Sequence, residues 1–286
     1  MDIDPTELSS GQHKTLKRFV RLITDRIHVR YLFCFAMQRR QSAVVHCLAP
    51  YTQRSRIDVD LLLVCADMKE LSVCQVQALA NNLGNEDYQY HISVVLHQTE
   101  ATRLLEAGDP FLCTVFSKGA LLYGHDDLSE ARRGYMCYRT RLQHIRNGWH
   151  RWFGKSCQFM DCAAYCLVER RYGMAVFMVH QTIEQACKAM IKVLLHTGAN
   201  THNLAWMLKL CGHVIPEVTT IFPRNSPEEK KLFELLKGSY IDWRYAEDFE
   251  VAEEQARELC NRAGILLKTI GEWSNNHIRT IEQYTQ

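Results

Sequence analysis

The hydrophobic pattern of the chain is clearest over residues 174–198, where apolar residues recur every three or four positions. A second apolar row beside the first makes this face wider than that of a surface helix. The remaining polar positions form a narrow stripe: His180, Gln181, Glu184, Gln185, Lys188 and Lys192. A helix that is apolar nearly all round is typical of the centre of a helical bundle.

The same helical spacing predicts further helices after residue 128, and no strand. They are expected at residues 133–170, 202–211, 227–236 and 249–270, followed by a polar tail at residues 275–286. The motif Ser226-Pro227-Glu228-Glu229 combines a capping box with proline at the first helical position, which marks a helix start. We therefore expect an all-α bundle in this part of the chain.

The pattern before residue 124 differs, because short runs rich in β-branched and aromatic residues predict strands. The expected strands are residues 29–35, 57–65, 90–96 and 120–123, and the clearest helices are residues 7–27 and 71–83. The stretch 39–56 contains a proline and no clear period, and is interpreted as a polar connection. These elements predict a small α/β domain with a mixed sheet over residues 1–127, followed by the all-α domain over residues 128–286.

Composition narrows the functional classes. Of the 286 residues, 47% are hydrophobic and 23% are charged, which is typical of a globular protein, and the net charge of +2 does not mark a dedicated nucleic-acid binder. The 12 cysteines form no Cys-x-x-Cys pair and predict reduced, buried thiols. The acidic start is not a secretory signal, and no apolar run approaches the roughly 18–20 residues of a membrane span. We expect a cytoplasmic protein without membrane contact.

Asp58 and Asp60 are the first candidate site. Side chains on a strand alternate between its two faces, so the Asp-x-Asp pattern places two carboxylates on one face. Such a pair can hold Mg²⁺, which binds nucleotide phosphates and activates an attacking hydroxyl. The alternative is that the two acids only begin a strand and face water.

The run LFCFA, a loop and then IDVDLLLV resembles the minimal nucleotidyltransferase domain, and the later ALLYG resembles its end. The resemblance implies a Mg²⁺ site at Asp58 and Asp60. However, Cys34-Phe35 stands where the family has a phosphate-cradling Gly-Ser turn, with Ser42 or Ser55 as replacements, and residues 90–96 carry no third carboxylate. We expect a degenerate, inactive transferase-like domain, with an active Mg²⁺-dependent nucleotidyltransferase as the alternative.

Residues 135–272 resemble the HEPN domain, an up-and-down helical bundle that often accompanies a minimal nucleotidyltransferase. The positions that carry the resemblance are Tyr172-Gly173, His180-Gln181, Glu184, Lys188, His202-Asn203-Leu204 and Arg244-Tyr245. The resemblance implies a homodimer formed through this domain. It also implies ligand-binding roles for His180, Gln181, Glu184, Lys188, His202, Arg244 and Tyr245.

Some HEPN proteins are ribonucleases with an Arg and a His four to six residues apart at the final helix. In this chain no histidine follows Arg244 until His277. Arg139 and His144 have the required spacing, but they lie in the first predicted helix of the bundle instead of the final one. A ribonuclease is therefore not expected. The basic and aromatic stretch 139–155 is interpreted as a bundle helix with a solvated basic face, so RNA is not the favoured partner.

The sequence thus predicts a two-domain protein that binds a nucleotide or another phosphate-bearing small molecule through the polar stripe. A positive charge from His180, Lys188 and Arg244 that exceeds the single carboxylate of Glu184 would favour an anionic ligand. Two alternatives stay open: the active transferase, and a structural interaction module in which the stripe only orders the bundle.

Overall fold

The structure is a computed structural model of the whole chain, and it describes residues 10–46, 49–66, 75, 88–124, 138–195 and 202–283. The chain forms two compact units, Met1–Met136 and Cys137–Gln286. The domain boundary predicted near residue 128 and the helix predicted at residues 71–83 lie outside the described residues, apart from Gln75, which is helical.

The first unit is built on a mixed four-stranded sheet with the strand order β3-β2-β1-β4. Its strands are β1 (Val29–His46), β2 (Ala49–Cys65), β3 (Tyr88–His97) and β4 (Ala120–Tyr123). β1 pairs antiparallel with both β2 and β4, whereas β2 pairs parallel with β3. The predicted α/β fold with a mixed sheet is confirmed.

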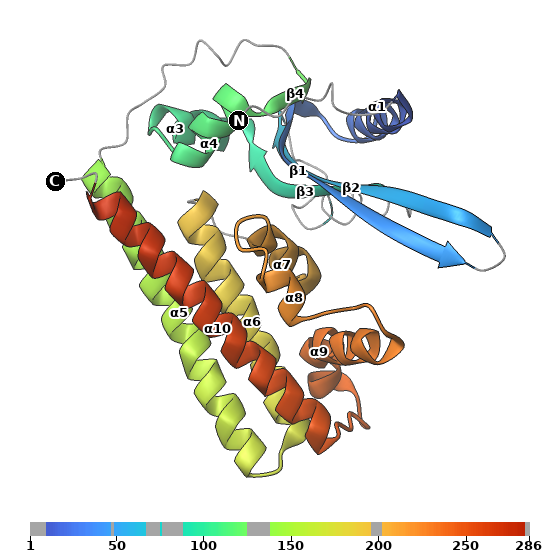
Figure 1. Cartoon of the computed structure of the whole chain (residues 1–286). Helices are drawn as coiled ribbons and strands as arrows, with labels where there is room; N and C mark the ends of the chain where they lie inside the picture. The colour runs from blue at the N-terminus through green and yellow to red at the C-terminus, as the bar shows by residue number, and fades with distance from the viewer. Residues whose placement is uncertain are drawn as a thin grey trace. The chain divides into compact units, whose positions relative to one another are not determined.

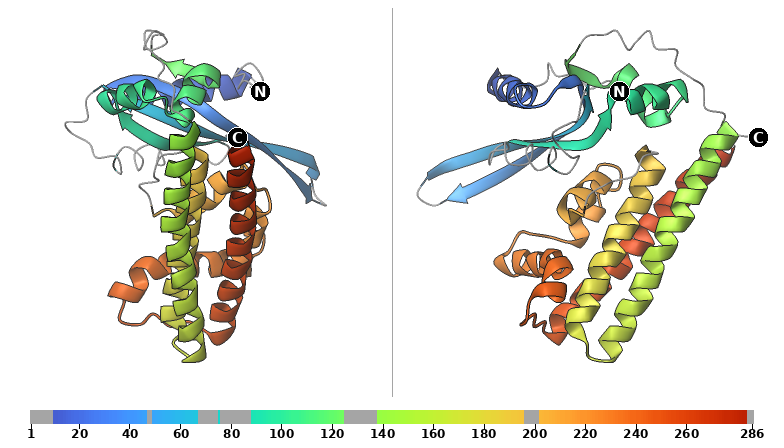
Figure 2. Two further views of the ribbon diagram at one scale, coloured as in Figure 1. Left: turned by 90° about the vertical axis from the view of Figure 1, so that its left-hand side faces the viewer. Right: turned by 180° about the vertical axis from the view of Figure 1, so that it is seen from behind.

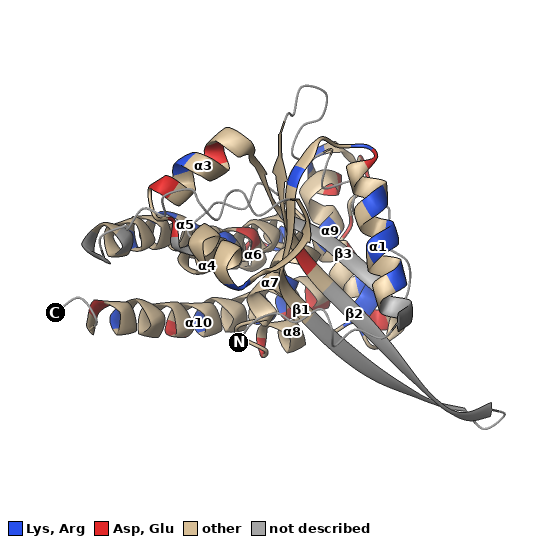
Figure 3. Ribbon diagram, turned by 90° about the horizontal axis from the view of Figure 1, so that it is seen from above, with Lys and Arg blue, Asp and Glu red and all other residues tan. Residues whose placement is uncertain are grey.

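Helices cover both faces of this sheet (Figure 3). On one face, α1 (Ser10–Thr24) contributes Phe19 and Ile23 to a core with Leu61 and Leu63 of β2. On the other face lie α3 (Gln98–Glu106) and α4 (Pro110–Lys118). There the rings of Phe116 and Phe33 lie 4.5 Å apart between centroids. The odd and even residues of the central strands therefore enter two different cores.

β1 and β2 continue well past their neighbours as a two-stranded ribbon (Figure 1). Their pairing extends through Arg40 opposite Arg56 to Val44 opposite Thr52, whereas β3 joins β2 only from Ile57 onwards. The predicted polar connection at residues 39–56 is therefore wrong. A half-buried strand shows alternation because one face packs on a core, and this stretch is polar without such alternation.

The second unit is helical, as predicted. Its helices are α5 (Tyr138–Val168), α6 (Tyr172–Leu195), α7 (Leu204–Gly212), α8 (Val218–Ile221), α9 (Pro227–Tyr245) and α10 (Glu253–Gln283). α6 contacts α5, α7, α9 and α10 (Figure 2). The side chains of Val179, Ile183 and Met190 are fully buried. The prediction that this helix is the centre of a bundle is confirmed.

The ends of the last two helices differ from the prediction. The capping box at Ser226 is present and α9 begins at Pro227, but this helix runs to Tyr245 rather than to residue 236. The predicted polar tail at residues 275–286 is wrong, because α10 continues to Gln283. Ile278 and Ile281 are buried in this part of the helix, and Glu282 pairs with Arg146 of α5. No helix among the described residues combines the length and the apolar character needed to cross a membrane.

Candidate functional site

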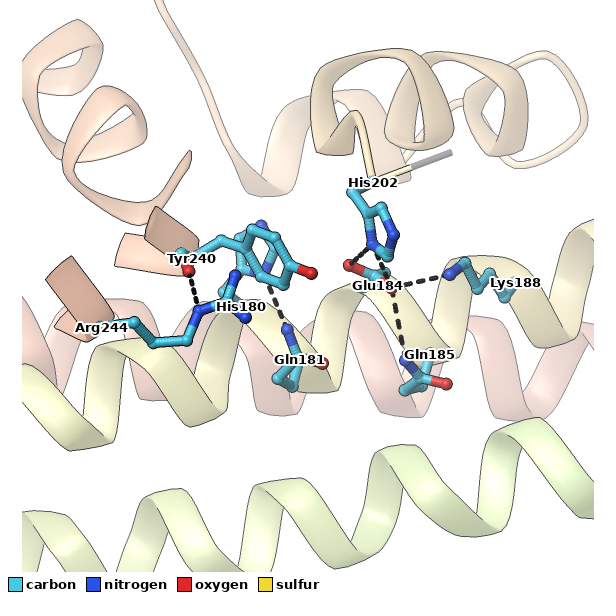
Figure 4. Close-up of polar contacts among 8 residues, drawn as sticks. All are labelled: His180, Gln181, Glu184, Gln185, Lys188, His202, Tyr240 and Arg244. Atoms are coloured by element: carbon cyan, nitrogen blue, oxygen red, sulfur yellow. Dashed lines mark hydrogen bonds and ion pairs between the residues drawn. The ribbon is translucent and has the colours of Figure 1, made fainter. Parts of the chain in front are cut away.

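Eight polar side chains gather along one side of α6, and we call them the α6 polar cluster (Figure 4). They are His180, Gln181, Glu184, Gln185, Lys188, His202, Tyr240 and Arg244. The first five come from α6, one precedes α7, and two come from α9. The structure thus brings together six of the seven predicted ligand-binding residues, and Tyr245 follows Arg244 at the end of α9.

Glu184 is the centre of the buried part of the cluster. Its side chain is 2% exposed, and its Oε1 lies 2.7 Å from Nζ of Lys188. Nδ1 of His202 lies 3.1 Å from both carboxylate oxygens. Burial alone would raise the pKa of the Glu184 carboxyl, but the hydrogen bonds from Lys188 and His202 outweigh it and lower this pKa. Glu184 is therefore a carboxylate at neutral pH, and its charge is matched by Lys188.

His180 lies one turn before Glu184 and is 1% exposed. Burial lowers the pKa of its imidazole to about 4, and the Glu184 carboxylate only partly opposes this shift. The ring stacks on Tyr240 with 5.2 Å between centroids, and Nε2 of Gln181 lies 3.3 Å from its Nδ1. At pH 7 His180 is thus neutral and adds no positive charge to the cluster.

Tyr240 connects the buried part of the cluster to the surface. Its ring also stacks on His202, with 5.1 Å between centroids. Nε of Arg244 donates a hydrogen bond of 2.8 Å to the carbonyl of Tyr240, and the guanidinium carbon lies 4.1 Å from the centre of the Tyr240 ring. The same carbon lies 5.4 Å from the centre of the Tyr245 ring, a residue that is 75% exposed.

The charge distribution in the cluster differs from the expected one. Three residues were expected to supply positive charge, but Lys188 is matched by Glu184 and His180 is neutral. The excess positive charge of the predicted set therefore lies on Arg244, which is exposed. Tyr240 was missed by sequence reasoning, because the predicted helix ended at residue 236. The sequence feature that could have identified Tyr240 is its spacing of four residues from Arg244, which places both residues on one side of α9.

Trp152 of α5 is less buried than Trp149 one turn before it. Trp149 is 4% exposed, whereas Trp152 is only half-buried. Lys188, Lys155 and Arg151 place their charged groups 5.2–5.8 Å from the centre of the Trp152 ring. Three cationic groups thus lie near this ring, and one of them is the Lys188 ammonium that also pairs with Glu184.

Asp58 and Asp60 occupy alternate positions of β2. Asp58 pairs with Gln38 of β1 and Asp60 with Ala36, without a register shift between them, so both residues belong to one face of the strand. Asp60 is fully buried, while the side chain of Asp58 lies outside the described part. Burial, and secondly the Asp60 carboxylate, raise the pKa of the neighbouring Cys34 thiol to about 12. Among the described residues, no group of three or more His, Cys, Asp or Glu side chains could hold a metal ion.

The chain also lacks a turn where the predicted first strand ends. β1 continues through Phe35 with a register shift between Cys34 and Ala36, and reaches His46. Ser42 pairs with Arg54 and Ser55 with Gln41, so both serines lie within the ribbon. The expectation that either serine forms a phosphate-cradling turn after the first strand is therefore wrong.

Of the pair with ribonuclease spacing, His144 is exposed on α5 and the side chain of Arg139 is outside the described residues.

Comparisons with known proteins locate a family in the second unit. No curated protein matches the chain. Among solved structures, the chain is similar to a nucleotidyltransferase-like protein from Exiguobacterium sibiricum 255-15, with 13% identity over 88% of this chain and 74% of that one. The TM-score of 0.28 is too low for this similarity to support an argument about the fold. The sequence model of the HEPN domain matches residues 149–273, which run from within α5 to within α10. The second unit therefore contains a HEPN domain at residues 149–273, and we call it the HEPN unit.

Proposed function

We propose that the HEPN unit binds a nucleotide, or a similar phosphate-bearing small molecule, at the surface formed by Arg244, Tyr245 and His202. The observation that carries this proposal is the setting of Arg244. Its guanidinium is exposed, rests on the ring of Tyr240, and forms no ion pair with a carboxylate of the described residues. The remaining N–H groups can therefore donate to an anion.

A guanidinium in this setting suits phosphate in particular. Its planar donors match two phosphate oxygens at once, and its charge makes these hydrogen bonds stronger than neutral ones. The hydrogen bond from Nε of Arg244 to the carbonyl of Tyr240 and the ring contact restrict the side chain before a ligand arrives. Less conformational entropy is then lost on binding.

Aromatic groups beside Arg244 supply a surface for a base. The Tyr245 ring is 75% exposed, and the His202 side chain is 58% exposed. Stacking on such rings contributes about 1–3 kcal/mol per base and depends little on which base is present. A phosphate near Arg244 and a base on these rings are the two parts of a nucleotide.

The buried members of the cluster have a positioning role in this proposal. Glu184 accepts hydrogen bonds from both His202 and Lys188, so it fixes the His202 ring relative to α6. His180 packs on Tyr240, and Gln181 contacts His180. These residues therefore hold the ligand-facing groups in place, while Arg244, Tyr245 and His202 meet the ligand.

Calorimetric titration with ATP, GTP and inorganic phosphate tests this proposal. We expect micromolar binding of a nucleotide, about −8 kcal/mol, that weakens with added salt. Arg244→Gln should weaken it at least tenfold, about 1.4 kcal/mol. Arg257→Gln is the matched control, because Arg257 is an exposed arginine of the same unit, 58% exposed and paired with Glu253. Equal loss in both variants, or no nucleotide binding, would contradict the proposal and favour a structural interaction module.

A second candidate function is Mg²⁺-dependent nucleotidyl transfer by the α/β unit. The observation that favours it is the strand register, which gives Asp58 and Asp60 a common face. Carboxylate oxygens suit Mg²⁺, so these two residues would hold the ion, and a bound Mg²⁺ would neutralise phosphate charge during transfer. The full burial of Asp60 and the missing turn after β1 make this candidate the weaker one, and a degenerate unit is the favoured proposal.

An assay for Mg²⁺-dependent transfer of labelled nucleotide distinguishes the two states of this unit. If the unit is active, Asp60→Asn should abolish the transfer, whereas Asp25→Asn should not, since Asp25 is exposed and pairs only loosely with Arg21 at 3.9 Å. If the unit is degenerate, the unchanged protein should show no transfer. Transfer that persists in Asp60→Asn would rule out the proposed metal site.

The homodimer formed through the HEPN unit and the cytoplasmic location also belong to the proposal. Light scattering of the purified chain tests the first, and a mass near twice 33.2 kDa is expected. Fractionation of the native cells tests the second. We propose that small nucleotides, rather than RNA, are the ligands of the HEPN unit, and that single-stranded RNA stays intact with the purified protein.

A further inference from the structure

Helix α1 of the first unit carries a strongly basic face (Figure 3). Residues 10–30 contain six lysines and arginines but a single acid, Asp25. Four of these cations occupy positions i, i+3, i+4 and i+7, which lie on one side of a helix, and all four side chains are exposed. We call them the α1 basic face, and they are Lys14, Lys17, Arg18 and Arg21.

The core of the first unit fixes the direction of this face. On the other side of α1, Leu16, Phe19 and Ile23 are buried against residues of the sheet. The helix therefore cannot turn its cations inwards without losing these apolar contacts. Within the described part of the chain, the α1 basic face has one ion pair, between Arg21 and Asp25 at 3.9 Å, and the Arg21 side chain is still 84% exposed.

The charges of α1 are arranged differently from those of α10. On α10, Arg257 pairs with Glu253, which lies four residues before it. Pairs of opposite sign at this spacing stabilise a helix, whereas pairs of like sign destabilise it. On the α1 basic face both pairs at this spacing are of like sign, as Lys14 and Arg18 illustrate. The face therefore lowers the stability of its own helix, and anions from another molecule would relieve this repulsion.

We infer that the α1 basic face binds the phosphate backbone of a nucleic-acid duplex, independently of any ligand of the HEPN unit. Cations on successive helical turns are about 5.4 Å apart, and a duplex carries one negative charge per about 1.7 Å of its axis. The face can thus meet several phosphates at once. The net charge of +2 does not oppose this binding, since the local charge of α1 governs the field that a polyanion meets.

The side chains of α1 favour a duplex over a single strand. Proteins that bind single strands without sequence preference stack the bases on aromatic rings. The one Phe, Tyr or Trp of α1 is Phe19, which is 2% exposed and belongs to the core. A duplex keeps its bases stacked inside and presents its phosphates outwards, so exposed cations are sufficient to bind it.

An anionic membrane is another polyanionic surface that a basic helix can meet. Helices that lie in a membrane interface insert their apolar side below the lipid headgroups. The apolar side of α1 is already occupied, because Leu16, Phe19 and Ile23 pack in the core of the first unit. A membrane would therefore have to bind α1 by charge alone, and anionic vesicles are included in the test.

Fluorescence anisotropy of the full chain with labelled DNA and RNA duplexes of about 20 base pairs tests the inference, between about 50 and 200 mM KCl. Each phosphate neutralised on B-DNA contributes about −0.9 to the slope of log K against log salt, so four contacts predict a slope of about −3.6. The double variant Lys17→Gln/Arg18→Gln should lose about 1.8 of that slope and bind at least tenfold more weakly at about 50 mM KCl.

Two further variants separate charge from folding. Lys17→Arg/Arg18→Lys keeps both charges and should keep most of the slope, because the salt dependence follows charge rather than side-chain shape. Lys230→Gln/Lys231→Gln removes the same net charge from the exposed surface of α9 and should leave binding unchanged. Circular dichroism of each variant should match that of the unchanged protein.

Binding of either duplex with the expected slope, and its loss in Lys17→Gln/Arg18→Gln, would support the inference. It would be overturned if neither duplex bound at about 50 mM KCl, if that variant kept the full slope, or if the α9 control lost as much. Tighter binding of single-stranded DNA than of the duplex would also overturn it, as would binding to phosphatidylserine vesicles but to neither duplex. A nucleotide titration that fails leaves these outcomes unaffected, because the proposed nucleotide site lies in the other unit.

Discussion

The α6 polar cluster and the β1–β2 ribbon are both polar runs in the sequence, yet their charges are distributed in opposite ways. In the cluster, a carboxylate with a 2% exposed side chain meets a lysine and a histidine within hydrogen-bonding distance. In the ribbon, four arginines share a hairpin with no acid. A burial cost enforces pairing in the first region, because an unpaired ion in a low-dielectric interior costs several kcal/mol. Residues 38–56 contain no acid, so no ion pair can form within that segment.

This difference shows that charge has to be counted over residues that lie close together rather than over the whole chain. The net charge of +2 averages over both regions and describes neither. The ion pair of Glu184 and Lys188 contributes zero to it, and the four arginines of the ribbon are offset elsewhere in the chain. Function assigned from whole-chain charge would therefore miss a region with a strong local field.

The largest expected effect is on the buried pair. Lys188→Met removes the ammonium that lies 2.7 Å from the Glu184 carboxylate, and should lower the free energy of unfolding by about 3 kcal/mol or more because a buried carboxylate loses its partner. Urea denaturation followed by circular dichroism measures this. Lys237→Met is the control, since Lys237 pairs with Glu234 at the surface, where such pairs contribute about 0–1 kcal/mol. If both variants lost similar amounts of stability, the ion pair in the α6 polar cluster would matter no more than an ion pair at the surface.

The next effect is the pH dependence of the same cluster. The folded pKa of His180 is about 4, below its ordinary value of 6.5, so the unfolded chain binds more protons between these pH values. Stability should therefore be complete above pH 6.5 and fall by about 3 kcal/mol as the pH drops towards 4. His180→Phe keeps a ring against Tyr240 and should remove this part of the slope. Denaturation at several pH values measures this dependence. If stability changed with pH in the same way in the unchanged protein and in His180→Phe, His180 would not be its source.

A third region lies between these two extremes, because its polar contacts are local and partly exposed. The Ser226 hydroxyl accepts from the N–H of Glu229, and Glu229 accepts from the N–H of Ser226. Ser226→Ala should cost about 1 kcal/mol of stability, and Ser226→Asp, which restores a capping acceptor, should recover most of it. Thermal unfolding of the two variants measures the difference. If Ser226→Ala lost as much stability as Lys188→Met, the size of such losses would not depend on how exposed the polar contact is.

The smallest effect is expected in the ribbon. Arg56→Gln removes one of two like charges at paired positions of the two strands, and should raise stability by a few tenths of a kcal/mol. Thermal unfolding at low salt is the measurement, since salt screens repulsion between charges. A clear loss of stability would show that the arginines hold the fold together, and would remove the contrast with the α6 polar cluster.

The sequence predicted those elements whose own residues carry a strong local signal. The apolar rows of α6 and the capping box before α9 are such signals, and both elements are present. The ribbon was missed because a strand that pairs beyond the sheet needs no alternation of apolar and polar residues. The end of α10 was missed because only Ile278 and Ile281 are buried in a charged stretch, and their packing partners lie far away in the sequence.

The candidate site was predictable in its residues but not in its charges. Helical spacing grouped His180, Glu184 and Lys188 on one side of α6, and the resemblance added His202 and Arg244. Their protonation and pairing depend on burial, which the spacing does not reveal. Trp152 illustrates the same limit, since it shares the helical spacing of Trp149 but lies beside Lys188 rather than in the core.

One face of β2 carries Arg54, Arg56, Asp58 and Asp60 at successive alternate positions. Its charge thus changes sign along a single strand within about 20 Å. Because Asp60 is fully buried, this row of charged positions continues into the interior of the first unit. A slip of β2 by one residue would turn Asp60 to the opposite face of the sheet and move an apolar neighbour into its place. The carboxylate thus makes the register of β2 costly to change.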